Sequence, residues 1–357
     1  MAEILGIGVT HYTGIIAPDQ NMAGFLRRTL RSEGVPREMK DPTHWPGPMQ
    51  AEWGSDGGAA AATQHRAAVV DGFRRIRQEI EAFRPDFLLV WGDDQYENFR
   101  EDGVPPFCIY IFDDMECRPL LGITSWAGTA ENVWGESPDS AFHIRGHADG
   151  ARYLVRRLLE HEFDVSYAYA TRSQKGLAHS FAQTMLFLDY HRTGIATPIV
   201  PFHVNCYGSL VVKSKGVGAH ITREGMVMDD PPAPTPARCF AIGQETARIL
   251  RASPWRVVLM GSSSWSHAFL TEKHHWLYPD HEADRQRLAE LRANEFSRWQ
   301  DLDPRDLERS GQHEFLNWVC LAGAMTELGY QAEVTNYVET YVFNSDKCFA
   351  IFRPAST

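Results

Sequence analysis

Residues 84–99 read Arg-Pro-Asp-Phe-Leu-Leu-Val-Trp-Gly-Asp-Asp-Gln-Tyr-Glu-Asn-Phe. Five apolar residues, 87–91, form a short bounded run, and Gly92, Asp93, Asp94 and Gln95 follow it directly. This pattern is typical of a buried strand that carries polar groups at its carboxyl end. Because open α/β sheets bind ligands beyond the carboxyl ends of their strands, the polar tip is a candidate site. Two aspartates at such a tip are also typical of a simple capped turn.

The residues before this strand have the spacing of a helix. Apolar side chains recur three and four residues apart, at Val69, Phe73, Ile76, Ile80 and Phe83. The spacing predicts an amphipathic helix of about four turns, which ends at Arg84-Pro85. Helix, tight turn and buried strand together predict an α/β unit.

The rest of the chain alternates in the same way. Further runs of strand length lie at 3–9, 107–112, 164–170, 199–204, 257–260, 332–343 and 348–352. Helical patterns lie at 153–159, 237–249, 282–299 and 313–327. Residues 34–63 have many prolines and glycines, and residues 114–148 have four glycines and no clear periodicity of apolar residues. We therefore expect long loops in both segments. The prolines of residues 229–236 predict an irregular connector.

The composition restricts the classes of function. The chain has 357 residues, of which 43% are apolar and 23% charged, as in an ordinary globular protein with a buried core. Its net charge of -11 disfavours nucleic acids and anionic membrane surfaces as partners, because both are negatively charged. Six cysteines are scattered without a C-x-x-C pair, which favours reduced thiols over disulfides or a zinc site.

The expected location follows from the absence of two signals. The first residues, Met-Ala-Glu-Ile-Leu-Gly, lack the basic region of a signal peptide. No apolar stretch approaches the ~20 residues that a membrane helix needs. We therefore predict a soluble, cytoplasmic protein without a membrane partner.

Three of the 15 histidines lie where an apolar segment meets polar sequence. His11 follows the first predicted strand. His179 precedes an apolar segment, and His267 follows a serine-rich strand end. A single histidine at such a place is more often structural, but three at similar places predict a functional site.

Glu314 stands in the first turn of the apolar helix predicted at 313–327. A carboxylate there is favourable simply because it faces the positive end of the helix dipole. The same residue, together with histidines, would also complete the facial site of a non-haem Fe(II) oxygenase. Both interpretations fit the sequence.

Several other catalytic motifs are missing. Residues 261–265 read Gly-Ser-Ser-Ser-Trp, which fails the G-x-S-x-G pattern of a serine hydrolase at its last position. The chain has no G-x-G-x-x-G, no G-x-x-x-x-G-K-[ST] and no H-E-x-x-H. A metal-dependent enzyme is therefore the class of function that the motifs support best.

Several stretches resemble one known family in the same order along the chain. They are Gly6–His11, Arg84–Asp86 with Asp94 and Gln95, Ala178–Ser180, Val200–Asn205, Arg238–Gly243, Trp265–His267 and His313-Glu314. The family is that of the class III extradiol ring-cleaving dioxygenases, which includes the catalytic subunit of protocatechuate 4,5-dioxygenase. The resemblance implies one catalytic domain over residues 1–357. It also implies a three-layer α/β sandwich with a central mixed sheet, similar to phosphorylase/hydrolase folds.

The resemblance further implies an Fe(II) ion held by two histidines and a glutamate. His11 falls on the first ligand and Glu314 on the glutamate. The second histidine position is occupied by Gln95, whose amide oxygen is a neutral and weaker ligand than imidazole. Either Gln95 binds the ion, or Asp94, Glu97 or His65 replaces it, or the site has lost iron.

The implied reaction is the opening of a catechol-like aromatic ring by O₂. His267 falls on the histidine regarded as acid/base, a role that suits a side chain titrating near neutral pH, and His179 falls on a second active-site histidine. Trp265, Tyr12 and Tyr96 are expected either to wall an aromatic pocket or to serve packing.

Two other classes of function stay open. One is a hydrolase or lyase on the same scaffold, with or without a metal. The other is a non-catalytic binding member, which the missing histidine would suit. The sequence also leaves open a homo-oligomer.

Overall fold

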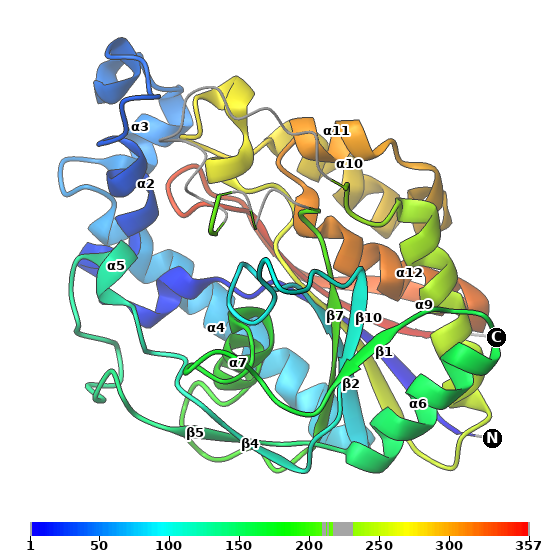
Figure 1. The fold of residues 1–357 in the computed structure, drawn as a ribbon. Coiled ribbons are helices and arrows are strands. Elements are labelled where there is room, and N and C mark those ends of the chain that lie inside the picture. The colour runs from blue at the N-terminus through cyan, green and yellow to red at the C-terminus, as the bar shows by residue number, and fades with distance from the viewer. Residues whose placement is uncertain (1, 209–211, 213, 217–230, 356–357) are drawn as a thin grey trace.

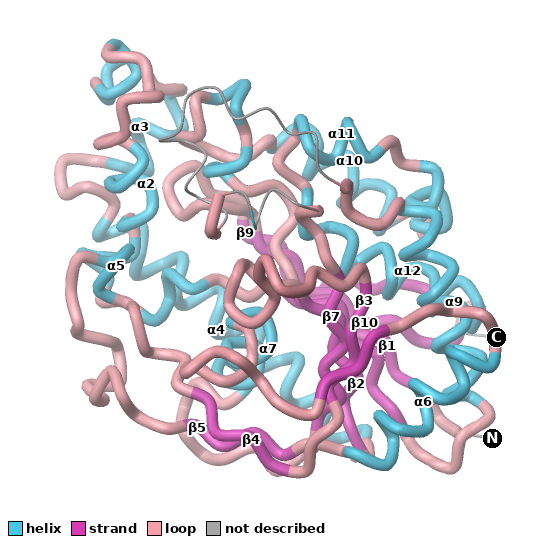
Figure 2. Tube along the Cα trace, viewed as in Figure 1, coloured by secondary structure: helices cyan, strands magenta, loops and turns pink. Residues whose placement is uncertain are grey.

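The computed structural model describes residues 2–208, 212, 214–216 and 231–355. Its centre is an eight-stranded sheet with the order β6-β3-β7-β2-β8-β1-β10-β9 (Figure 2). The strands are β1 Ile4–Val9, β2 Phe87–Gly92, β3 Phe107–Tyr110, β6 Ser166–Ala168, β7 Ile199–Val204, β8 Val257–Ser262, β9 Tyr330–Val338 and β10 Lys347–Pro354. A separate antiparallel pair consists of β4 Asp114–Cys117 and β5 Phe142–Arg145.

The central sheet is mixed. The neighbours β1, β8, β2 and β7 are parallel, as are β3 and β6. Antiparallel pairing occurs where β3 meets β7 and where β10 meets β1 and β9. The first strand therefore lies between two strands from the last third of the chain, so both ends of the chain contribute to one sheet.

Helices cover both faces of the sheet (Figure 1). One face carries α4 Ala59–Phe83 and α7 His179–Leu188, and the other carries α6 Ala148–Glu160, α9 Pro236–Arg251 and α12 Leu316–Leu328. Along β2, the side chains of Phe87, Leu89 and Trp91 enter one apolar core, whereas those of Leu88 and Val90 enter the other. This double burial explains the continuous apolar run in the sequence. The predicted three-layer α/β sandwich with a central mixed sheet is confirmed.

Helices α9 and α12 pack against each other through glycines. A Cβ atom on Gly323 would lie 2.0 Å from the carbonyl oxygen of Phe240, and one on Gly243 would lie 1.9 Å from that of Cys320. The absence of side chains at these two positions therefore allows the helix backbones to touch. This packing helps to position α12, which begins at Leu316, two residues after Glu314.

The prediction of one long loop at residues 34–63 is wrong in part. It contains the helix α3 Gly47–Trp53, and α4 already begins at Ala59, well before the expected amphipathic stretch. Pro48 in the first turn of α3 favours the helical conformation, and glycines with positive φ, among them Gly54 and Gly58, flank the two helices. The alanines that open α4 favour a helix without showing any apolar periodicity.

Other boundaries also differ from the expectation. The loop predicted at 114–148 holds the β4–β5 pair and the short helix α5 Thr124–Ala127. The helix predicted at 282–299 ends early, as α10 His281–Arg292, and a 3-10 helix follows at Phe296–Asp301. The strand predicted to reach residue 343 ends at Val338 in β9. Of the predicted connector at 229–236, residues 231–235 are irregular, residue 236 already begins α9, and residues 229 and 230 lie outside the described part.

Within the described residues, no helix combines the length and the apolar character that crossing a membrane requires.

Replacing Gly323 with alanine should lower the free energy of unfolding by about 1–3 kcal/mol, because α9 and α12 must move apart to admit the methyl group. Urea denaturation followed by circular dichroism measures this change. Gly103→Ala is the matched control, since a Cβ atom there has no other atom within 4 Å. Equal stabilities of the two variants would contradict the close packing of the helices.

Candidate metal centre

The sheet brings three strand ends to one edge. In the parallel register, Val9 of β1 pairs with Ser262 of β8, and Trp91 of β2 pairs with Gly261 of the same strand. The segments that follow these strands therefore emerge side by side. They carry His11, Asp93 and His267. Glu314 reaches the same place from the 3-10 turn His313–Phe315, which leads into α12.

His11, Asp93 and Glu314 form a buried cluster, in which one ligand atom of each residue lies within 4.8 Å of the others. Neither carboxylate oxygen of Asp93 has a hydrogen-bond partner among the described residues, and the same holds for Oε2 of Glu314. Unpaired carboxylate oxygens in the interior are costly. Because imidazole and carboxylate are ordinary ligands of divalent metals, these residues fit a metal ion.

The other oxygen of Glu314 is fully engaged. Gln95 Nε2 donates to Glu314 Oε1 at 2.8 Å, and the Tyr207 hydroxyl donates to the same oxygen. Gln95 Nε2 also lies 3.0 Å from the Tyr207 hydroxyl oxygen. On the opposite side, His267 Nε2 lies 3.4 Å from Glu314 Oε2. The carboxylate is therefore oriented by two donors at one oxygen, and its second oxygen faces the cluster.

The ring of His11 is fixed by hydroxyl groups. Its Nδ1 lies 3.1 Å from Ser262 Oγ, which in turn lies 2.5 Å from Thr184 Oγ1. Since Nδ1 is occupied, Nε2 is the ring nitrogen left for the cluster. A hydrogen bond to the distal nitrogen is the usual support of a metal-binding histidine.

His179 and His267 are held in different protonation states. Burial lowers the pKa of His179, but the Glu97 carboxylate, 3.0 Å from Nδ1, outweighs this effect and raises it to about 9. Burial lowers the pKa of His267 to about 3. Near neutral pH the site therefore contains an imidazolium at His179 and a neutral imidazole at His267.

The cluster itself carries perturbed groups. Burial raises the pKa of Glu314 to about 7. Burial and the nearby Glu314 carboxylate raise the pKa of Asp93 well above its usual range. Burial and the neighbouring histidines lower the pKa of His11. Each of these shifts has burial as its largest cause, and a bound cation would oppose the shifts of the two carboxyl groups.

The residues considered as replacements for Gln95 have other contacts. Asp94 accepts hydrogen bonds from the backbone N–H groups of residues 97, 98 and 99, so it caps the turn after β2. Glu97 is paired with His179. His65 packs edge-on against the Tyr12 ring, with its centroid 4.7 Å from that of Phe343, and does not line the pocket.

A cavity of about 400 Å³ opens above the cluster. His11, Gln95, His179, His267 and Glu314 line this cavity, whereas Asp93 is fully buried and is not part of the lining. The wall includes the stacked rings of Phe25 and Trp126, whose centroids are 5.0 Å apart. Of the aromatic residues expected from the sequence, Tyr12 lines the cavity, Trp265 is buried in the core, and Tyr96 lies outside the lining.

Three cations also line this cavity: Arg28, Lys175 and Lys215. None of them forms an ion pair within the described part of the chain. Cations without partners around a cavity favour an anionic ligand.

Sequence reasoning missed two residues of the site, Asp93 and Tyr207. Asp93 belongs to the polar tip that the sequence marks as a candidate site, but it was not considered as a metal ligand, because the resemblance directed attention to position 95. Tyr207 follows the end of β7, the sheet neighbour of β2, so its position after a predicted strand was the available signal.

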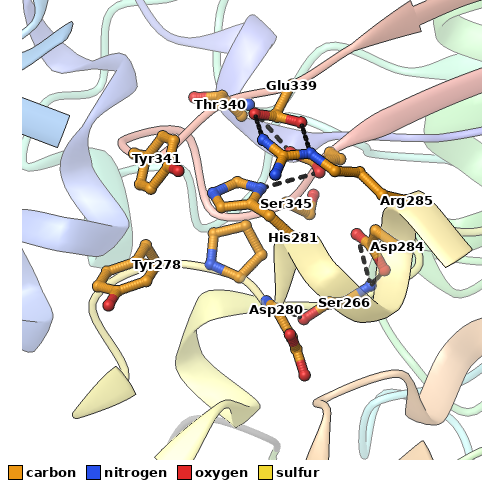
Figure 3. A network of polar contacts seen from close by, with 12 residues as sticks. Ser266, Tyr278, Asp280, His281, Asp284, Arg285, Glu339, Thr340, Tyr341 and Ser345 are labelled. Carbon is orange, nitrogen blue, oxygen red and sulfur yellow. Dashed lines mark hydrogen bonds and ion pairs between the residues drawn. The ribbon is translucent and has the colours of Figure 1, made fainter. Parts of the chain in front are cut away.

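A buried carboxylate joins the two loops that carry the site (Figure 3). Asp284 of α10 accepts hydrogen bonds from the Ser266 backbone N–H at 3.0 and 3.2 Å, beside His267. It also accepts one from Gln312 Nε2 at 2.6 Å, two residues before Glu314. Asp284 thereby fixes both loops relative to each other.

A second group of ligand-type residues consists of His281, Glu339 and Asp346. Arg285 forms an ion pair with Glu339 (Figure 3). Asp346 accepts hydrogen bonds from the Tyr337 hydroxyl and the Thr340 backbone N–H, and its Oδ2 lies 3.0 Å from His281 Nδ1. Since both carboxylates already have protein donors, this group is a structural network.

Comparison with known proteins confirms the resemblance. Residues 226–349 match the family described as the catalytic LigB subunit of aromatic ring-opening dioxygenase. The chain is 26% identical over 200 residues to the 2,3-dihydroxyphenylpropionate/2,3-dihydroxicinnamic acid 1,2-dioxygenase 2 of Pseudomonas putida, covering 56% of this chain and 49% of that protein. A similarly named dioxygenase of Comamonas testosteroni is 24% identical over 210 residues, 58% of this chain and 50% of that one.

The chain thus spans about half the length of the curated relatives it matches. A crystal structure of an uncharacterized protein from Escherichia coli K12 covers 80% of this chain and 91% of its own, with a TM-score of 0.46 and 12% identity. By sequence, the chain is similar to the LigB-type ring-opening dioxygenases.

Asp284→Ala should destabilise the protein by about 2–4 kcal/mol, because it leaves the Ser266 N–H and the Gln312 amide without an acceptor in the interior. Urea denaturation measures this loss. The control is Asp71→Ala, which removes an exposed carboxylate paired with Arg74 and should leave the midpoint near that of the wild type. A midpoint for Asp284→Ala as high as that of the control would contradict the bridging role.

Proposed function

We propose that this relative of the ring-opening dioxygenases is itself a metal-dependent enzyme that uses Fe(II) and O₂ to open an aromatic diol. The observation that carries the proposal is the buried cluster of His11, Asp93 and Glu314, two of which line a cavity together with His179 and His267. Buried carboxylate oxygens without a hydrogen-bond donor support a cation at this place. The similarity to the LigB family supports the class of reaction.

Under this proposal, His11 and Glu314 hold the ion, and a bound Fe(II) would supply the redox chemistry between the diol and O₂. The protein fixes these ligands before substrate enters. Ser262 orients the ring of His11, while Gln95 and Tyr207 orient the carboxylate of Glu314. Support of this kind raises both affinity and selectivity for the metal.

His179 and His267, the two histidines of the cavity that are not proposed as ligands, have different roles in proton transfer. His267, whose Nε2 lies 3.4 Å from Glu314 Oε2, is placed to accept a proton from a substrate hydroxyl and to return it later. His179 is kept protonated by Glu97, so it can donate a hydrogen bond to an anionic oxygen of the substrate.

The cavity suggests the kind of diol. Phe25 and Trp126 offer an aromatic wall, and the unpaired cations Arg28 and Lys175 favour a negatively charged substituent. The relatives are named for 2,3-dihydroxyphenylpropionate and 2,3-dihydroxicinnamic acid, aromatic diols that carry a carboxylate. We therefore propose aromatic diols with an acidic side chain as the substrate class.

A metal-dependent hydrolase or lyase is the second candidate. The observation that favours it is the pair of carboxylates in the cluster, since a site with more oxygen donors also suits ions that do no redox chemistry. Oxygen uptake separates the two candidates.

Protein purified without oxygen and supplied with Fe(II) should consume O₂ when 2,3-dihydroxyphenylpropionate is added. His11→Ala combined with Glu314→Ala should abolish both the bound metal and the uptake, because two ligands are lost. An oxygen electrode and metal analysis measure the two effects, and circular dichroism confirms folding. Conversion of the substrate without O₂ uptake would favour the hydrolase or lyase, and full metal content in the double variant would refute the ligand assignment.

His267→Ala should keep the metal but lower turnover by roughly 10²–10⁴-fold, the usual contribution of a general acid–base group. Metal content and O₂ uptake are measured on the same sample. His143→Ala, which changes an exposed histidine outside the cavity, serves as the control. If His267→Ala lost the metal, the residue would be a ligand and the acid–base role would be refuted.

A further inference from the structure

The position after β2 contains two candidates for one ligand. The side chain of Asp93 is fully buried, and both of its oxygens lack a partner among the described residues. Gln95, two residues later, lies in the cavity wall and makes hydrogen bonds through its amide nitrogen. The carboxylate of Asp93 therefore lies in the cluster with His11 and Glu314, whereas the amide of Gln95 donates a hydrogen bond to Glu314.

We infer that the ion is held by His11, Asp93 and Glu314, and that Gln95 acts as a positioning residue for Glu314. The inference rests on the proposed function in that it places a divalent ion at this cluster. The resemblance implies a ligand set of two histidines and one carboxylate. The inferred set instead has one histidine and two carboxylates.

The surroundings of Asp93 disfavour its charged form unless a cation is bound. The charged groups that act on it are the carboxylates of Glu314 and Glu97 and the imidazolium of His179. His179 is already paired with Glu97. A buried carboxylate beside a second carboxylate, without a lysine or arginine of its own, is compensated by a bound cation.

The backbone aims Asp93 into the cluster. Its carbonyl oxygen accepts a hydrogen bond from Ser180 Oγ at 2.6 Å, which ties the turn after β2 to the start of α7. Gly92 permits this contact, because a Cβ atom there would lie 2.7 Å from Ser180 Oγ. The turn is thereby held against α7, and the Asp93 carboxylate lies in the cluster with His11 and Glu314.

Gln95 is better explained as a support for the ligand Glu314. Together with Tyr207 it occupies Oε1 of Glu314, which leaves Oε2 for the ion. Donation from the amide also fixes the orientation of the carboxylate plane. This is the arrangement of an outer hydrogen-bond partner, whose loss typically weakens metal binding by about 10- to 100-fold.

The donor set also predicts which ions compete for the site. A site with two carboxylates is a harder and more negative site than one with two imidazoles. Oxygen donors suit Mn(II), whereas imidazole suits Fe(II). Replacing Asp93 with histidine should therefore increase the preference for Fe(II) over Mn(II).

The test is an anaerobic titration with Fe(II) alone and, separately, with Mn(II) followed by electron paramagnetic resonance. Asp93→Asn keeps the size of the side chain but removes a proposed ligand. It should weaken the binding of both ions by more than about 100-fold, which is the largest effect usually seen when an outer hydrogen-bond partner is lost. Gln95→Leu should still bind one ion, weakened by about 10- to 100-fold. Gln95→His should bind no more tightly than the wild type, and Asp93→His should raise the Fe(II) to Mn(II) affinity ratio.

Thermal melting of the metal-free proteins checks folding. Asp93→Asn should melt no lower than the wild type, since the carboxyl group that it replaces has no hydrogen-bond partner among the described residues, but it should lose the increase in Tm that added metal gives the wild type. Wild-type affinity in Asp93→Asn, or tighter binding in Gln95→His, would overturn the inference.

Because these measurements need no turnover, metal binding at Asp93 without O₂ uptake would refute only the dioxygenase proposal. O₂ uptake by an Asp93→Asn variant with wild-type affinity would refute only the ligand assignment.

Discussion

The feature on which the rest of the site depends is the burial of two neighbouring carboxyl groups without a basic side chain paired to either. Asp93 and Glu314 lie in one buried cluster with His11, and within the described residues no lysine or arginine forms an ion pair with either carboxylate. Such an arrangement is unfavourable without a cation. The surrounding groups are arranged accordingly, with hydroxyl and amide donors at the outer atoms of His11 and Glu314 and free oxygens directed inward.

The fold produces this concentration of charge through the order of its strands. β8 pairs with β1 on one side and with β2 on the other, so segments separated by most of the chain meet at one edge of the sheet. The close packing of α9 and α12 then determines where Glu314 enters, and Asp284 holds the His267 loop against the segment that leads to it. Sites at the carboxyl ends of parallel strands can therefore be changed by single substitutions in the turns while the sheet is retained.

The sequence predicted most of the scaffold and the positions of three histidines and a glutamate. It succeeded where apolar runs report burial directly, as in β2, and where a histidine follows a strand, as with His11. It could not separate Asp93 from Asp94, because which of two adjacent carboxylates caps a turn depends on backbone donors three to five residues later. It also could not show that His65 packs behind Tyr12, since that contact joins the long helix α4 to a distant strand end.

The central claim is that a divalent ion binds between His11, Asp93 and Glu314. The most direct measurement is anomalous diffraction at the iron edge from crystals grown and soaked with Fe(II) under anaerobic conditions. We predict a single anomalous peak within bonding distance of all three side chains, with Gln95 still hydrogen-bonded to Glu314. A peak bonded to Gln95 or Glu97 instead of Asp93, or no peak in protein saturated with Fe(II), would contradict the account.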